Sequence, residues 1–232
     1  MNSIVTVFQF EIRYSHILNF SQIGRKIIAP YVKLAQSISV ENQNSLEERL
    51  VLNFEDDEYL IIVAWDRLLI KGQNSISKYT EPNSPFQMPF LDILDKLRKL
   101  SEFGSIKNIL FAINYIKKLD VTKDKLFDYF ISKSLMPTSN GIIDKMNDIA
   151  IILESKEATK EEYITFGPYF DSSEILKRPI VPVKFDSLKE IDFVGIMAEY
   201  KYLKKTNEVS QDLFNELVIR SEKATNKLWK AL

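Results

Sequence analysis

The sequence predicts an α+β fold, in which a duplicated strand–helix–three-strand–helix unit forms a curved antiparallel sheet with helices on one face. Two observations predict this fold. Residues 48–73 contain three apolar runs separated by two short charged breaks, which is the pattern of an antiparallel meander. The alternating Phe-x-Ile-x-Tyr of residues 10–14 returns at residues 111–115, which indicates that the second half of the chain repeats the first.

The first strand and the first helix are predicted from two different periods. Apolar and polar side chains alternate over residues 8–14, as in a strand with one buried face. From Ile23 to Ile38 apolar residues recur every three or four positions, as on one face of a helix. Pro30 lies within that stretch, and we expect it to kink or interrupt the helix because it has no amide hydrogen to donate.

The meander follows, with strands at 50–54, 59–65 and 68–70. Residues 59–65 are apolar throughout, so we expect them to form the middle strand, covered on both faces. Carboxylates in the acidic break at 55–58 could hold a hard cation, but the break lacks the spacing of a calcium loop. We therefore interpret it as a solvated turn. A helix over 90–100 completes this half and ends near Gly104.

The second half is predicted to follow the same order. Its expected elements are a strand at 106–116, a helix at 122–135, strands at 148–154 and 163–170, a long loop at 171–187, a strand at 191–203 and a C-terminal helix over 209–228. The first repeat then covers residues 1–104 and the second covers 105–232, and we expect the two to form one compact pseudo-twofold domain. That shape resembles the saddle of the TATA-box-binding fold, in architecture only.

A short motif in the second half carries a further resemblance. Residues 111–119 read Phe-Ala-Ile-Asn-Tyr-Ile-Lys-Lys-Leu. This stretch resembles the centre of a sporadically distributed, uncharacterised bacterial protein family, whose members carry a strand of the type L-R-Y-I-N-R-I at this point. Asn114 stands where that family has arginine, and Lys117 where it has asparagine. The resemblance covers the element order of most of the chain, and it implies no activity.

Composition bounds the class of protein. The 232 residues include 31 basic and 32 acidic side chains, so a net charge of −1 provides no overall attraction to nucleic acid or an anionic membrane. Cysteine is absent, which excludes disulfides and cysteine nucleophiles and favours a cytoplasmic protein. No apolar run approaches the roughly 18 residues of a membrane span, so we expect no membrane association.

Patterns of catalytic residues are scarce. His16 is the only histidine, so neither a zinc site of the usual composition nor a Ser-His-Asp triad has support. Neither of the two common glycine-rich phosphate loops occurs. We therefore assign no catalytic, cofactor-binding or metal-ligating residue, and we expect no cofactor.

The sharpest enzymatic hint is Glu199-Tyr-Lys201 at the end of an apolar strand, which resembles the E-x-K half of the PD-(D/E)xK nuclease motif. Alternation would place both charges on one face, where the glutamate would hold magnesium and the lysine would position water. Asp171 is the candidate for the partner carboxylate. The same pattern occurs at 154–156, and the simpler interpretation of Glu199 and Lys201 is an exposed charge pair.

The sequence favours a non-enzymatic cytoplasmic binding or adaptor subunit that engages a protein partner or another copy of itself. Aromatic residues make up 12% of the chain, and such residues anchor interfaces when they are exposed. Lysines cluster at 201–205 and 223–230, but interspersed acidic residues disfavour nucleic acid as the partner. The alternative function is a metal-dependent nuclease that uses Glu199 and Lys201.

Overall fold

The computed structural model describes residues 4–54, 56, 58–134, 148–180, 182–184 and 191–232. The strands are β1 (Ile4–Tyr14), β2 (Ser37–Glu41), β3 (Arg49–Phe54), β4 (Tyr59–Ala64), β5 (Arg67–Gln73), β6 (Ile106–Lys118), β7 (Ile151–Lys156), β8 (Lys160–Tyr169) and β9 (Gly195–Lys204). The helices are α1 (Phe20–Ile28), α2 (Asp92–Arg98), α3 (Lys123–Ser134), α4 (Ser173–Leu176) and α5 (Gln211–Ala231).

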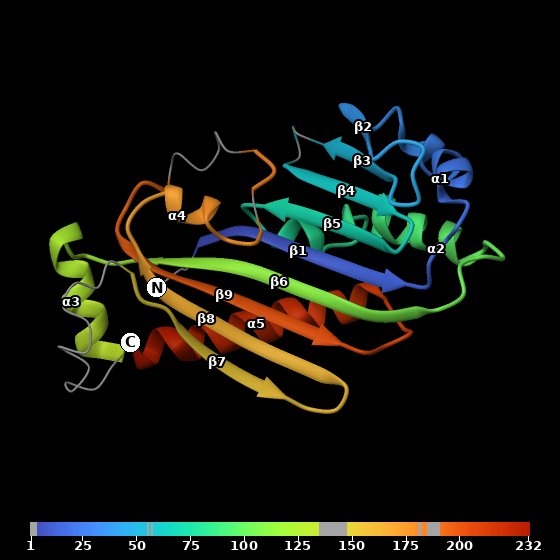
Figure 1. The fold of residues 1–232 in the computed structure, drawn as a ribbon. Coiled ribbons are helices and arrows are strands. Elements are labelled where there is room, and N and C mark those ends of the chain that lie inside the picture. Colours follow the sequence, from blue (N-terminus) through green and yellow to red (C-terminus); the bar gives the residue numbers. More distant parts are fainter. Residues whose placement is uncertain (1–3, 55, 57, 135–147, 181, 185–190) are drawn as a thin grey trace.

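Within this part of the chain, nine strands form one sheet in the order β2-β3-β4-β5-β1-β6-β9-β8-β7 (Figure 1). All neighbouring strands in it run antiparallel. Helices and an antiparallel sheet together confirm the predicted α+β class.

The two long strands β1 and β6 lie side by side at the centre of the sheet, with Phe10 directly opposite Phe111. Outward from this pair, the order is β5, β4, β3 on one side and β9, β8, β7 on the other. The two halves therefore share one strand order, and β2 is an additional edge strand of the first half.

The prediction of a helix from Ile23 to Ile38 is wrong beyond Ile28. Helix α1 ends there, a tight helical turn contains Pro30, and Ile38 lies in β2 opposite Leu52. Pro30 removes an amide donor that a continuing α-helix needs. The alternating Ser-Ile-Ser-Val-Glu that follows has the period of a strand, and pairing with β3 decides in favour of that period.

The meander is confirmed as β3, β4 and β5, with β4 in the middle. The prediction that both faces of β4 are covered is wrong. Ile61 is fully buried on the helix-covered face, whereas Ile62 points to the opposite face and is half-buried. Side chains alternate along a strand, and in the described part of the chain no helix covers that second face of the meander. In the acidic break before β4, Glu55 and Asp57 lie outside the described residues.

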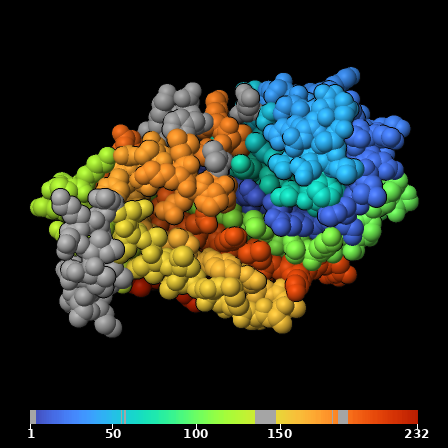
Figure 2. Space-filling view, viewed as in Figure 1, coloured from blue at the N-terminus to red at the C-terminus, as the bar shows by residue number. Residues whose placement is uncertain are grey.

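Helices α1, α2 and α5 lie on one face of the sheet, but the prediction that helices cover only that face is wrong for α4 (Figure 1). Ile175 of α4 packs on the opposite face against Ile116 and Met197. Figure 2 shows this face, with the orange segment around α4 lying over the second half. The predicted loop at 171–187 thus contains a helical turn, whose backbone donates a hydrogen bond to the Asp171 carboxylate.

Other boundaries in the second half differ from the prediction by a few residues. Strand β9 begins at Gly195 rather than at residue 191, and β7 and β8 are shifted relative to the predicted 148–154 and 163–170. Helix α3 matches the helix predicted at 122–135, whose last residue lies outside the described residues.

Phe214 of α5 lies at the centre of the core. Its ring centroid is 4.1 Å from that of Phe86 and between 5.7 and 5.9 Å from those of Phe8, Phe10 and Phe111. These four partners come from both central strands and from the turn before α2. Helix α5 therefore joins the two halves through one shared aromatic cluster.

Candidate functional site

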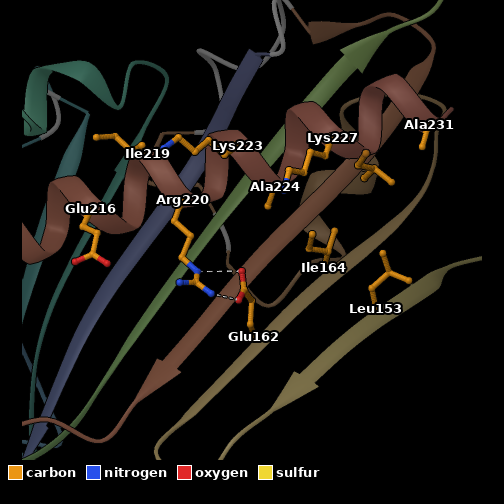
Figure 3. Close-up of a pocket in the computed structure, with 11 residues that line it drawn as sticks. Leu153, Glu162, Ile164, Glu216, Ile219, Arg220, Lys223, Ala224, Lys227 and Ala231 are labelled. Atoms are coloured by element: carbon orange, nitrogen blue, oxygen red, sulfur yellow. Dashed lines mark hydrogen bonds and ion pairs between the residues drawn. The ribbon is translucent and has the colours of Figure 1, made fainter.

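A groove runs between α5 and the outer strands β7 and β8, with a volume of about 690 Å³ (Figure 3). Many of its lining residues are apolar. They are Leu153, Ile164, Ile219, Ala224, Leu228 and Ala231. Leu153 and Ile219 are each 50% exposed, so the groove presents aliphatic surface to solvent from both the sheet and the helix.

An ion pair joins the helix to the sheet inside this groove. The Glu162 carboxylate accepts hydrogen bonds from Arg220, with Nη2 to Oε2 at 2.5 Å and Nε to Oε1 at 3.2 Å, as Figure 3 shows. The Tyr200 hydroxyl donates to the same carboxylate at 2.9 Å. The bond from Arg220 lowers the pKa of Glu162, and Glu162 raises the pKa of Arg220. Both groups stay ionised and satisfied by each other, so they fix α5 to β8.

Free charges lie on the helix side of the groove. Lys223 and Lys227 are one turn apart on α5, and neither forms an ion pair with any other residue that the structure describes. Like charges at this spacing destabilise a helix by about 0.2–0.5 kcal/mol. Glu216 lines the groove nearer the N-terminus of α5. The groove is therefore basic along the C-terminal half of α5 and acidic at its other end.

The corresponding place in the first half is filled. Ile12 of β1 and Ile113 of β6 are the middle residues of the two Phe-x-Ile-x-Tyr motifs. The row of paired residues that begins at Ile12 reaches Val63 and Leu50, and the row that begins at Ile113 reaches Ile164 and Leu153. Val63 and Leu50 are 0% and 1% exposed. Helix α1 covers them so closely that a Cβ atom at Gly24 would lie 3.0 Å from the Leu50 side chain. Leu153 is half exposed, and no helix among the described residues covers it in this way.

Helix α3 follows β6 along the chain as α1 follows β1, but it lies at one end of the sheet (Figure 1). The Phe130 ring of α3 is 6.0 Å from the Phe166 ring of β8. Leu126 and Ile131 are buried on the same helix. Helix α3 thus packs against Phe166, and none of its residues lines the groove beside α5 among those that the structure describes.

The residues of the nuclease hypothesis lie elsewhere. Glu199 pairs with Asn114 and Lys201 with Ala112, so both side chains lie on the sheet face opposite α5, as alternation predicts. Asp171 comes after the end of β8, whose last residue, Tyr169, pairs with Gly195 of β9. Gly195 is four residues before Glu199 in the same strand. Four residues of strand span roughly 13 Å.

Asp171 is engaged by its own neighbours. It accepts hydrogen bonds from the Ser173 hydroxyl at 2.5 Å and from Lys123 Nζ at 2.9 Å, which lower its pKa to about 2. Among the described residues, no group of three His, Asp or Glu side chains could hold a metal ion.

The interpretation of Glu199 as an exposed charge pair with Lys201 is wrong. Within the described part of the chain, the buried Oε2 atom of Glu199 has no hydrogen-bond partner. The Lys201 ammonium instead lies 5.9 Å from the centre of the Tyr163 ring. Burial raises the pKa of the Glu199 carboxyl. The neighbouring Asn114 side chain is fully buried and Glu199 is half-buried, so these polar groups lie partly inside the protein rather than on an exposed charged surface.

Glu199→Gln is expected to raise the midpoint of urea denaturation at pH 8 and to leave it nearly unchanged at pH 4. The folded state binds the Glu199 proton more tightly than the unfolded state, whose glutamate titrates near about 4.3. The stability of the wild type therefore falls as pH rises from below that value through the raised pKa, and glutamine removes this loss. Glu154→Gln is the control, because Lys156 lowers the pKa of Glu154. The prediction fails if both substitutions shift the midpoint alike.

Other sequence candidates are dispersed. His16 is exposed and lies 4.2 Å from Trp65 between ring centres. Lys201 faces away from α5, whereas Lys223 and Lys227 lie on that helix, so the lysines do not form one basic stripe. The sequence did not predict the groove, because no local pattern distinguishes the half-exposed Leu153 from a strand leucine whose side chain is buried.

Comparison of the chain with models of known protein families and with curated proteins yields no match. None of the helices that the structure describes is long and apolar enough to span a membrane.

Proposed function

We propose that this chain is a non-enzymatic, cytoplasmic binding or adaptor subunit that holds a protein partner in the groove beside α5. One observation carries the proposal: Leu153 is half exposed at a place in the sheet where its counterpart Leu50 is buried beneath a helix. Burying a large aliphatic side chain contributes about 1.5–3 kcal/mol, so a partner that covers Leu153 and Ile219 gains a substantial part of its binding energy there.

We also infer that the two halves arose by duplication. The shared strand order supports this, as does the position of Phe10 opposite Phe111, through which a twofold axis relating the two Phe-x-Ile-x-Tyr motifs would pass. On this view the second half has lost the covering helix of the first and has gained a binding groove.

The proposal is tested by placing the photo-crosslinking residue p-benzoylphenylalanine at position 219 in cells that natively express the chain. We expect a discrete covalent adduct with a protein after irradiation, because this position faces the groove and is exposed. The same residue at position 18 is the control, since Leu18 is 71% exposed and lies outside the groove. Adding Leu153→Asp should abolish the adduct at position 219.

No adduct at position 219, or equal adducts at both positions, would overturn the binding function. The nuclease alternative has its own assay, cleavage of plasmid DNA with magnesium or manganese. Cleavage by the wild type that Glu199→Gln abolishes would replace the binding proposal with the enzyme.

A further inference from the structure

We infer that the partner enters the groove as an amphipathic α-helix of about 15 residues that runs antiparallel to α5, with acidic residues toward its N-terminus. This inference rests on the proposed function and specifies its partner. Helical form follows from the first half of the molecule, where the corresponding place beside β4 and α2 is occupied by a helix, α1. The groove lies above the corresponding strands of the second half, so the space between these strands and α5 has the width of a packed helix.

The dimensions of the groove agree with a helix. Its lining on α5 extends from Glu216 to Ala231, which at 1.5 Å per residue is roughly 22 Å. A helix of about 15 residues has this length. A strand added to the edge of β7 would lie in the plane of the sheet and would leave Ile164 of β8 uncovered. One apolar stripe of a bound helix would instead contact the apolar residues of both strands and of α5 at the same time.

Charge defines the sequence of that helix. Lys223 and Lys227 have no acidic partner in the described part of the chain, and Arg220 is already bound to Glu162. Acidic residues opposite the two lysines would relieve their mutual repulsion. At the other end of the groove, Glu216 favours a basic residue. Helix α1 of the first half has Arg25 and Lys26 in its last turn and no acidic residue in its first turn. It therefore matches only the basic end of the charge pattern expected for the partner helix.

The same charges determine the direction. The N-terminus of a helix is stabilised by acidic side chains and its C-terminus by basic ones. Acidic residues therefore belong near the start of the partner helix, which places that start beside the C-terminal half of α5. The two helices then run antiparallel.

The test uses three fluorescein-labelled synthetic peptides of 16 residues. The acidic peptide has leucine at every third or fourth position and glutamate elsewhere in its first half. The basic peptide has lysine in place of each glutamate, and a scrambled acidic peptide lacks the helical period. We expect fluorescence anisotropy to show at least tenfold tighter binding of the acidic peptide than of the other two.

A charge reversal in the protein provides the matched comparison. The double variant Lys223→Glu/Lys227→Glu should reverse the preference, so that the basic peptide binds more tightly. Lys230→Glu is the control, because Lys230 is exposed on α5 outside the groove lining and its reversal should leave the preference unchanged.

Absence of acidic-peptide binding, equal binding of acidic and basic peptides, or equal binding of the scrambled peptide would overturn the inference. So would a crosslinked adduct at position 219 with twice the mass of the chain, which would identify a second copy as the occupant. The proposed function survives such a result if position 219 still forms a specific adduct, and it fails separately if no adduct forms.

Discussion

Phe214→Ala is expected to lower the free energy of unfolding by about 3–5 kcal/mol, the largest loss that we predict for one substitution. The phenyl ring packs against Phe8 and Phe10 of β1, Phe111 of β6 and Phe86. Alanine would leave a cavity among rings that the sheet holds in place, and the sheet cannot move in to fill it. Because these rings come from both halves, we expect the variant to lose stability in one cooperative transition that involves the whole sheet.

Urea denaturation monitored by tryptophan fluorescence and by far-ultraviolet circular dichroism tests this expectation. Ile219→Ala, on the same helix but 50% exposed, is the matched control and should change stability by less than about 0.5 kcal/mol. Similar midpoints for the two variants would show that Phe214 is not at the centre of the core. Separate transitions by the two probes would show that the halves unfold independently.

Ile61→Ala is expected to cost about 2–5 kcal/mol, whereas Ile62→Ala should cost about 1 kcal/mol. The two residues are identical in type and adjacent in β4. Ile61 is 0% exposed on the helix-covered face, between Leu52 and Ile70 in the neighbouring strands. Ile62 lies on the opposite face and keeps part of its contact with water in the folded state. Less apolar surface is therefore lost to solvent when it is shortened.

The difference between the midpoints of the two variants measures the orientation of β4 directly. A register shift by one residue would exchange the two side chains between the faces and would reverse the order of the effects. Equal effects would show that both faces of the meander are covered in solution.

Local sequence patterns correctly predict the α+β class, the meander and the face of β1 and β3 that packs into the helix-covered core. Alternation in β1 correctly predicts that Phe8, Phe10 and Ile12 are buried, and alternation in β3 does the same for Leu50 and Leu52. These features are local, because the direction of a side chain in a strand depends only on the residues beside it. Sequence reasoning also placed Glu199 and Lys201 on one face for the same reason.

Which of these surfaces a helix covers follows only from the packing of the folded chain. Helices α1 and α3 follow equivalent strands and both have an apolar side, yet α1 lies over β3 and β4 while α3 lies against Phe166 at the end of the sheet. The ion pair between Glu162 and Arg220 joins residues 58 positions apart. The place where a helix packs depends on contacts between segments distant in sequence, and its own apolar period does not specify them. The groove beside α5 is lined by residues of β7, β8 and α5, which are distant in sequence, so no single stretch of the sequence predicts it.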